Sequence, residues 1–146
     1  MRLLFFGRFA VLCSIVFLWA HPGPAQELKE SYSARGQAYG LTYDGQNFWY
    51  SEPATRKVFR IDAAGRAQGF YLGNRQIYGL QFNVADGLIY VGAEKELLKV
   101  NPSTGSVVGR LPVPLEKIAG LDFGNNFYYL LEKDTGVIHF YDPGLS

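Results

Sequence analysis

The sequence predicts an all-β protein that contains one structural unit three times. Aromatic residues make up 16 % of the chain and 17 residues are glycine, a composition that favours strands joined by tight turns. After residue 25 no stretch shows a sustained helical period of apolar residues, which argues against long amphipathic helices. A Gly-Leu pair recurs at Gly40, Gly79 and Gly120, so the repeat has a period of about 40 residues.

Each repeat contains the same succession of β-forming runs, separated by turns rich in Gly, Asn and Asp. The runs of the first repeat are 39–43, 47–51, 57–62 and 68–72; those of the second are 78–82, 88–92, 96–101 and 106–111; those of the third are 119–123, 126–131 and 137–142. The repeats therefore span 39–72, 78–111 and 118–146. Four short antiparallel strands in ~40 residues form the blade of a β-propeller.

The repeat resembles the blades of propellers of the NHL, streptogramin-lyase and SMP-30/gluconolactonase type. Those blades read Gly-hydrophobic-x-aromatic, an Asp/Asn-Gly turn, an aromatic strand, and then hydrophobic-x-x-hydrophobic-Asp-x-x-Gly. In the first repeat Gly40-Leu-Thr-Tyr43 and Val58-Phe-Arg-Ile-Asp62 match this pattern, and the resemblance extends from Tyr39 to Gly144. It implies blades stacked around a central channel, whereas the Gly-His and Trp-Asp signatures of WD40 blades are absent.

The blade set predicted in this sequence is incomplete, because the third repeat has no fourth run. A spare run, Glu30–Ala34, precedes the first repeat, where it is expected to be an outer strand. Propellers typically close with ~4–8 blades. One hypothesis is a two-fold homodimer that forms a six-bladed ring, in which residues 30–34 complete the partner's third blade. The alternatives are a truncated remnant of a larger propeller, whose remaining blades were lost or come from another chain, and a small β-sandwich.

The N-terminus predicts export. Arg2 and Arg8 precede an uncharged apolar run over 9–20, which is typical of a signal peptide and is short for a membrane-spanning helix. We predict cleavage after Ala25, a mature domain of residues 26–146, and a secreted or periplasmic location. The single cysteine, Cys13, lies in the leader, so no disulfide is expected. A net charge of +1 gives no reason to expect nucleic acid or an anionic membrane as partner.

A ligand site is expected at one end of the channel, in the loops that lead into the innermost strands. Two of these loops share an Arg, a Gln and a Tyr before the Gly-Leu pair. The candidate ligand-binding residues are Arg35, Gln37, Tyr39, Arg75, Gln76 and Tyr78. They are suited to stack a planar or sugar-like ligand and to neutralise an anionic group. The alternative role for the two tyrosines is to plug the channel.

The resemblance to SMP-30-like enzymes implies a divalent cation, calcium or magnesium, held by oxygen ligands. Glu52 and Glu132 follow equivalent second strands and are the candidate metal ligands, with further oxygen ligands near the first strands. The latter are Asp44, Asn83 and Asp122. The alternative is that these side chains are solvated turn residues.

Nucleophilic catalysis is not predicted. The mature chain retains one histidine, His139, and has no Gly-x-Ser-x-Gly element. His139 aligns with Phe59 and Leu98, positions that pack between blades. We therefore predict a binding or scaffold module without assigned catalytic residues. The alternative is a cation-dependent lactonase or hydrolase of SMP-30 type, or a lyase of streptogramin-lyase type.

Overall fold

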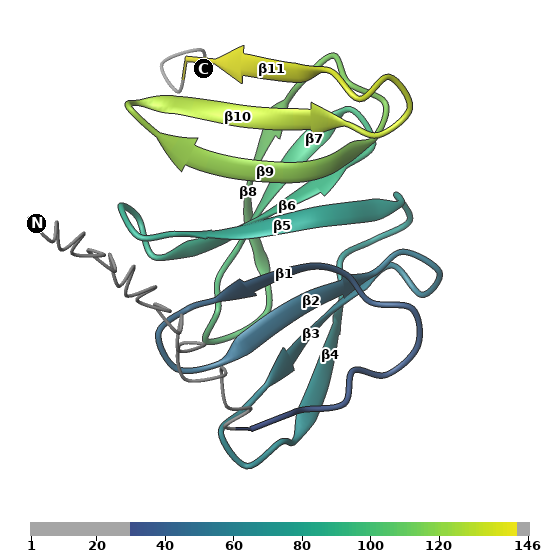
Figure 1. Cartoon of the computed structure of the whole chain (residues 1–146), viewed down its shortest axis with the longest axis vertical. Helices are drawn as coiled ribbons and strands as arrows, with labels where there is room; N and C mark the ends of the chain where they lie inside the picture. Colours follow the sequence, from purple (N-terminus) through teal and green to yellow (C-terminus); the bar gives the residue numbers. More distant parts are fainter. Residues whose placement is uncertain (1–29, 143–146) are drawn as a thin grey trace, which may run out of the picture. The chain divides into compact units, whose positions relative to one another are not determined.

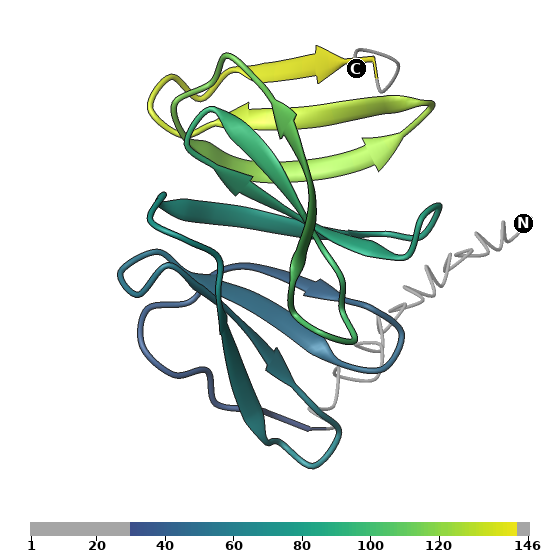
Figure 2. The ribbon, with the colours of Figure 1, turned by 180° about the vertical axis from the view of Figure 1, so that it is seen from behind.

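A computed structural model describes residues 30–142, and in this range it contains strands and no helix (Figures 1 and 2). The first sheet comprises β1 (Tyr39–Tyr43), β2 (Phe48–Glu52), β3 (Lys57–Ile61) and β4 (Ala67–Tyr71). The second comprises β5 (Ile77–Asn83), β6 (Leu88–Ala93), β7 (Glu96–Val100) and β8 (Val107–Pro112), and the third β9 (Ile118–Gly124), β10 (Phe127–Glu132) and β11 (Ile138–Tyr141). The predicted leader, residues 1–25, lies outside the described residues.

Each sheet is an antiparallel meander in which consecutive strands pair with one another. We call the sheets blade 1, blade 2 and blade 3 in chain order. Blades 1 and 2 have four strands, whereas blade 3 has three in the described part of the chain. The predicted all-β fold, with a last blade that lacks its outer strand, is thus confirmed for these residues. From residue 30 to residue 142 no helix is long and apolar enough to cross a bilayer.

Short polar turns set the hairpins. In the β1–β2 turn, Asp44 Oδ1 accepts hydrogen bonds from the backbone N–H groups of Gln46, at 2.8 Å, and Asn47, at 2.7 Å. In the β9–β10 turn, Asn125 and Asn126 have φ angles of 50° and 63°. Two successive left-handed residues are the requirement of a two-residue type I′ hairpin, and Asn tolerates that conformation well.

Blade 2 is covered on both faces. We call the face of a blade that meets the following blade its front face, and the face that meets the preceding blade its back face. Trp49 and Val58 on the front of blade 1 pack with Leu80, Ile89 and Val91 on the back of blade 2. The front of blade 2 and the back of blade 3 form a second core cluster, whose buried members are Tyr90, Leu97, Val113, Leu115, Ile118, Leu121 and Leu130.

The innermost strands β1, β5 and β9 approach one another closely at the glycines of the repeat (Figure 1). A Cβ on Gly40 would lie 3.0 Å from the backbone nitrogen of Leu80. A Cβ on Gly79 would lie 2.5 Å from the carbonyl oxygen of Ala119. The distance at Gly79 is shorter than real Cβ contacts, and at Gly40 a tight 3.0 Å approach is combined with a φ of 42°, which also favours glycine. Glycine is therefore preferred where one inner strand crosses the next.

A second feature repeated between blades links a turn, an aromatic ring and a cation. Trp49 Nε1 donates to Asp44 Oδ2 at 2.7 Å, and the Arg60 guanidinium lies 5.9 Å from the centre of the Trp49 ring. In blade 2 the hydroxyl of Tyr90 donates to Asp86 Oδ2 at 2.7 Å, and Lys99 Nζ lies 5.1 Å from the Tyr90 ring. The polar end of each front-face ring is thereby satisfied as the ring is buried.

Replacing Gly79 with alanine should destabilise the contact between blades 2 and 3. The added methyl group would meet the Ala119 carbonyl at 2.5 Å, so we expect a loss of ~1–3 kcal/mol in the free energy of unfolding. Chemical denaturation followed by circular dichroism measures this loss. The matched control is Gly124→Ala, where the nearest atom beyond the chain neighbours is Tyr129 Cε2 at 3.5 Å, and an equal loss in both variants would contradict the explanation.

Candidate ligand site at the inner strand ends

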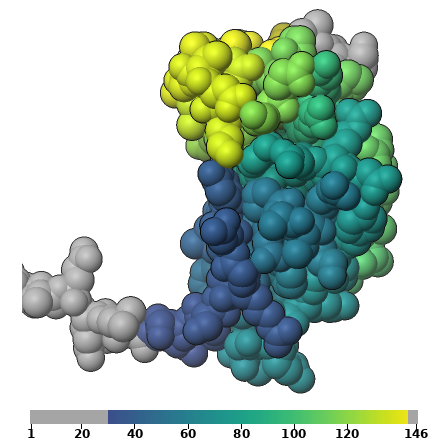
Figure 3. Space-filling view, turned by 90° about the vertical axis from the view of Figure 1, so that its right-hand side faces the viewer, coloured from purple at the N-terminus to yellow at the C-terminus, as the bar shows by residue number. Residues whose placement is uncertain are grey.

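The starting ends of the inner strands gather residues from all three blades. Tyr39 begins β1, Tyr78 is the second residue of β5, and Lys133 follows the end of β10. Because first and second strands are antiparallel, the start of β9 and the end of β10 lie at the same end of blade 3. Figure 3 shows the β10–β11 turn, in yellow, beside the dark blue residues that lead into β1. We call Tyr39, Tyr78, Gln76 and Lys133 the mouth cluster.

An ammonium group over two aromatic rings defines the mouth cluster. Lys133 Nζ lies 5.2 Å from the centre of the Tyr39 ring and 4.7 Å from that of Tyr78. The two rings meet edge to face, with their centres 6.0 Å apart. The Tyr78 ring is buried, whereas Tyr39 is 39 % exposed. Cation–π attraction of this kind is worth about 0.5–2 kcal/mol and keeps the ammonium group at this end of the inner strands.

The turn that carries Lys133 is held by several polar contacts. The backbone N–H of Lys133 donates to the carbonyl of Lys117 at 2.9 Å, and Lys117 Nζ donates to Asp134 Oδ2 at 2.8 Å. Within the turn, Thr135 Oγ1 donates to Glu132 Oε2 at 2.7 Å. The hydrogen bond that Lys117 donates to Asp134 raises the pKa of the Lys117 ammonium group above its ordinary value. The position of Lys133 is therefore fixed by the fold before any ligand binds.

The structure brings together some of the predicted ligand-binding residues. Tyr39 and Tyr78 are neighbours, and the Tyr78 hydroxyl donates to Gln76 Oε1 at 2.5 Å, which places Gln76 in the same cluster. Arg75 is engaged elsewhere: its Nη1 donates to the carbonyl of Glu94 at 2.8 Å, and its Nε lies 3.2 Å from Glu96 Oε1. Both partners of Arg75 belong to blade 2.

Arg35 and Gln37 lie in the exposed segment that leads into β1. The backbone N–H of Arg35 donates to the Tyr50 hydroxyl at 2.9 Å, which fixes this segment against blade 1. Lys133 was not among the predicted residues, because the equivalent positions in the other repeats are Pro53 and Glu94. No repeated residue type marks this position in the sequence.

The candidate metal ligands Glu52 and Glu132 each have a hydrogen-bond donor within their own turn. Thr55 Oγ1 donates to Glu52 Oε2 at 2.5 Å, in the same way that Thr135 serves Glu132. The Glu52 carboxylate also rests on the backbone of Gly36, where a Cβ would overlap it. Across residues 30–142 no three His, Cys, Asp or Glu side chains are grouped so as to hold a metal ion.

His139 occupies the register that the sequence predicts. It lies opposite Leu130, as Phe59 lies opposite Tyr50 and Leu98 opposite Val91. Its ring is tilted against Tyr141, and its Nε2 lies 3.6 Å from Glu132 Oε2. This places His139 on the back face of blade 3 rather than in the mouth cluster.

The sequence suggested three other oxygen ligands. They lie towards the ends of the inner strands that are opposite the mouth cluster: Asp44, Asn83 and Asp122. Asn83 Oδ1 accepts from the Ala85 N–H at 3.0 Å, and Asp122 Oδ1 accepts from the Phe123 N–H at 2.8 Å. Each is bonded to backbone of its own turn or strand. These contacts give the three residues a local structural role.

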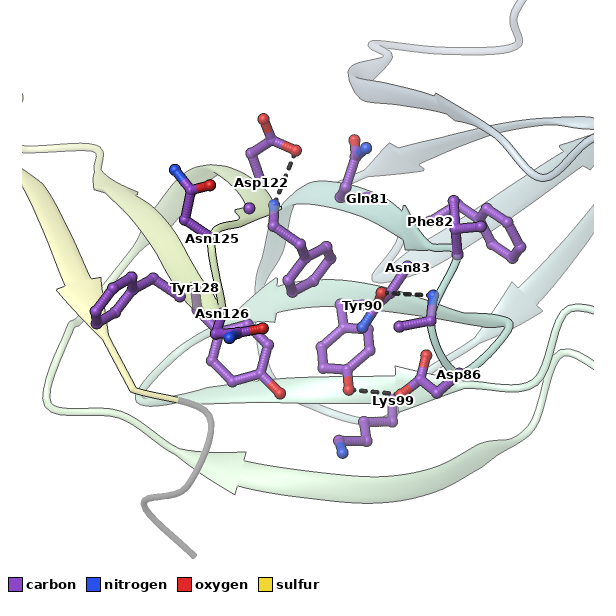
Figure 4. A pocket seen from close by; sticks show the side chains of 15 residues that line it. Gln81, Phe82, Asn83, Asp86, Tyr90, Lys99, Asp122, Asn125, Asn126 and Tyr128 are labelled. Atoms are coloured by element: carbon purple, nitrogen blue, oxygen red, sulfur yellow. Dashed lines mark hydrogen bonds between the residues drawn. The ribbon is translucent and has the colours of Figure 1, made fainter.

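A groove of about 620 Å³ lies between blades 2 and 3, at the end of the inner strands opposite the mouth cluster (Figure 4). Its aromatic lining includes Tyr90, Phe123 and Tyr128, with the Tyr90 and Phe123 ring centres 4.7 Å apart. Burial, together with hydrogen bonds to Tyr128 and Asp86, raises the pKa of Tyr90, so its hydroxyl stays protonated and donates to Asp86. The volume is in the range of small-molecule sites.

No family model and no curated protein sequence matches this chain. Solved structures do match. A luciferin-regenerating enzyme aligns with a TM-score of 0.56 at 17 % identity, covering 70 % of this chain and 40 % of that one. A streptogramin B lyase aligns with a TM-score of 0.55 at 19 % identity, and the alignment covers 72 % of this chain and 40 % of the lyase. Glutaminyl cyclase from Myxococcus xanthus aligns with a TM-score of 0.56 at 18 % identity, and the alignment covers 73 % of this chain and 48 % of the cyclase.

These neighbours are β-propeller proteins, so the chain has the β-propeller fold that its repeat predicts. The resemblance is one of fold, because the identities are all below 20 %. The chain spans less than half the length of each of these three proteins.

Asp44 offers a test of the structural role assigned to the turn carboxylates. Partial burial raises its pKa, but hydrogen bonds from Trp49, Asn47 and Gln46 outweigh this, and the net pKa lies below the ordinary 3.8. A group with a depressed pKa contributes stability above its unfolded pKa and loses it as pH falls through the folded value. Asp44→Asn should therefore lower the melting temperature at pH 7, and the difference from the parent protein should shrink below about pH 4.

Circular dichroism melting curves between pH 7 and pH 2.5 measure this difference. Asp122→Asn is the matched control, because Asp122 is exposed and accepts one backbone hydrogen bond without holding an aromatic ring. If the melting-temperature difference between Asp44→Asn and the parent protein did not change with pH, the carboxylate charge would not contribute to stability.

Proposed function

We propose that this chain is an exported β-propeller binding module whose ligand site is the mouth cluster. One observation carries the proposal: three successive blades each place one side chain at the same end of the inner strands, with Lys133 over the rings of Tyr39 and Tyr78. Export is inferred from the N-terminal sequence alone.

The chemistry of the cluster favours an anionic ligand that has a flat or sugar-like body. Lys133 supplies a positive charge, and no ion pair involves its ammonium group among residues 30–142. Tyr39 offers an exposed ring for stacking, and Gln76 offers amide donors beside the Tyr78 hydroxyl. Sugar acids and aromatic carboxylates combine these features, so they are the ligand classes we expect.

An enzymatic role is the second candidate, because structural neighbours include a lyase and a cyclase. On this alternative Glu52 and Glu132 would bind calcium or magnesium in a hydrolase or lactonase, or the chain would act as a lyase. Binding is favoured over this alternative because both carboxylates already accept a hydrogen bond from a threonine of their own turn.

Removing the charge of Lys133 should weaken binding. We expect Lys133→Met to lower the affinity for a uronic acid such as glucuronate at least ~10-fold, because a charge-assisted hydrogen bond is lost while the aliphatic contact with the rings remains. Isothermal titration calorimetry measures the affinity, with the neutral parent sugar and benzoate as comparison ligands.

The matched control for this variant is Lys99→Met. Lys99 also lies over a tyrosine ring, 5.1 Å from the centre of Tyr90, but at the opposite end of the inner strands. The control should retain the affinity of the parent protein. Equal affinities for the parent and Lys133→Met, or no binding of any carboxylate to the parent, would contradict the proposed site.

Metal content separates the two candidate functions. We expect protein dialysed against metal-free buffer to contain no stoichiometric calcium or magnesium, because Glu52 and Glu132 serve their turns. Elemental analysis by mass spectrometry measures this directly. A stoichiometric ion that disappears in Glu132→Gln, and persists in the groove variant Asp122→Asn, would support the enzymatic alternative instead.

A further inference from the structure

The back face of blade 1 is only partly covered, whereas the other back faces are buried. Its Tyr50 and Ile61 are buried, and the segment that leads into β1 contacts Tyr50, but the side chains of β1 on this face are exposed. Leu41, Leu80 and Leu121 occupy the same repeat position, yet Leu41 is 69 % exposed while Leu80 and Leu121 are 4 % and 9 % exposed. Tyr43 and Phe48, the next positions on this face, are also exposed. A cleft of about 470 Å³, lined mainly by apolar side chains, lies over the same face.

The front face of blade 3 is uncovered in the same way. Ile138 is 56 % exposed, although Val58 and Leu97 at the equivalent positions are fully buried by the following blade. Phe140 is 67 % exposed and stands where blades 1 and 2 carry the cations Arg60 and Lys99. At the Phe140 position this face is apolar, whereas the two front faces that are covered within the chain carry a cation there. Capping repeats of a self-sufficient stack are polar on the outside.

No backbone of a following blade crosses Gly120 in the described chain. The equivalent glycines, Gly40 and Gly79, are needed because the next inner strand crosses them. A Cβ on Gly120 would meet only the Leu131 side chain of its own blade, at 3.6 Å, which is an ordinary contact. Within the described chain, glycine is therefore not required at this position.

Tyr32 marks where an outer strand of a preceding blade would lie. On blade 2, Phe70 of the outer strand β4 packs against Gly105 of the β7–β8 turn. On blade 1, the Tyr32 ring packs against Gly65, which has the equivalent place in the β3–β4 turn: a Cβ there would lie 3.5 Å from Tyr32 Cδ1. Tyr32 thus stands on blade 1 where Phe70 stands on blade 2.

We propose that a second copy of this chain docks its blade 3, front face first, onto the back face of blade 1, and receives the same contact in return. The resulting two-fold ring has six blades, within the ~4–8 of known propellers. The three strands of the partner's blade 3 fill the cleft over Leu41 and Phe48. Residues 30–34 become the fourth strand of that blade, beside β11.

A second copy fits this surface better than an unrelated protein for two reasons. The chain already joins its own blades twice by the same pair of faces, so both halves of the required interface are present in one sequence. In addition, β11 pairs only with β10 among the described strands, and Tyr32, before β1, has on blade 1 the place that Phe70 of an outer strand has on blade 2. One symmetry operation covers both apolar faces and both strand edges.

The mass of the purified, processed protein in solution is the first test. Native mass spectrometry and light scattering should give twice the chain mass at micromolar concentration. A monomer would overturn the proposal and would mean that blades from another source cover these faces. A trimer or an open-ended series of oligomers would overturn closure by two copies.

Single substitutions on the two faces test the front-to-back arrangement. Leu41→Glu on the back of blade 1 and Ile138→Glu on the front of blade 3 should each raise the dissociation constant at least ~100-fold, because each buries an unpaired charge. Val108→Glu is the control, since Val108 is an exposed apolar residue of the outer strand β8. Sensitivity to only one of the two face variants would indicate pairing of like faces and would overturn the proposal.

Gly120→Ala keeps the test valid if a charged variant fails to fold. The added methyl group meets nothing closer than 3.6 Å in the single chain, so the monomer should retain its circular dichroism spectrum. In the ring the same methyl group would meet the partner's β1 backbone, and the dimer should dissociate at higher protein concentration than the parent. An unchanged dimer would overturn the predicted contact.

Discussion

The close approach of neighbouring inner strands is the constraint on which the rest of this structure depends. Gly40 and Gly79 allow β1, β5 and β9 to cross with backbone nearly touching backbone. Because the strands are so close, their starting residues are also close, which is why the rings of Tyr39 and Tyr78 meet. The same approach lets Ser51 Oγ donate across the blade boundary to the carbonyl of Tyr78. Blade packing and the mouth cluster thus have one geometric origin.

The repeat predicts backbone position well and side-chain role less well. The runs predicted within the three repeats coincide with the strands to within a residue or two, because turn chemistry and alternation mark strand ends directly in the sequence: the run 57–62 became β3, Lys57–Ile61. Residues 30–34, predicted as an outer strand, form no strand in this structure. Tyr39 and Tyr78 were predictable partners because they flank the same Gly-Leu pair. Arg75 was predicted to line the channel on the same grounds, yet it pairs with Glu96. Equivalent backbone positions do not fix where a long side chain points.

Lys133 illustrates the other limit of reasoning from a repeat. A site assembled from several blades can use a residue that occurs once, and such a residue has no equivalent to reveal it. Its position depends on the turn that follows β10, on the carbonyl of Lys117 and on the ion pair between Lys117 and Asp134. None of these contacts is encoded in the spacing of the repeat, so the cation could be found only from the folded chain.

The sequential order of strands in each blade has a consequence for how the chain reaches its fold. Every strand pair in the described chain joins neighbours in sequence, so each hairpin closes a short loop at low entropic cost. Folding rates rise as contacts become more local, and such a chain can acquire its blades one after another. The contacts between blades then add in order, each using a surface that the previous blade has already presented.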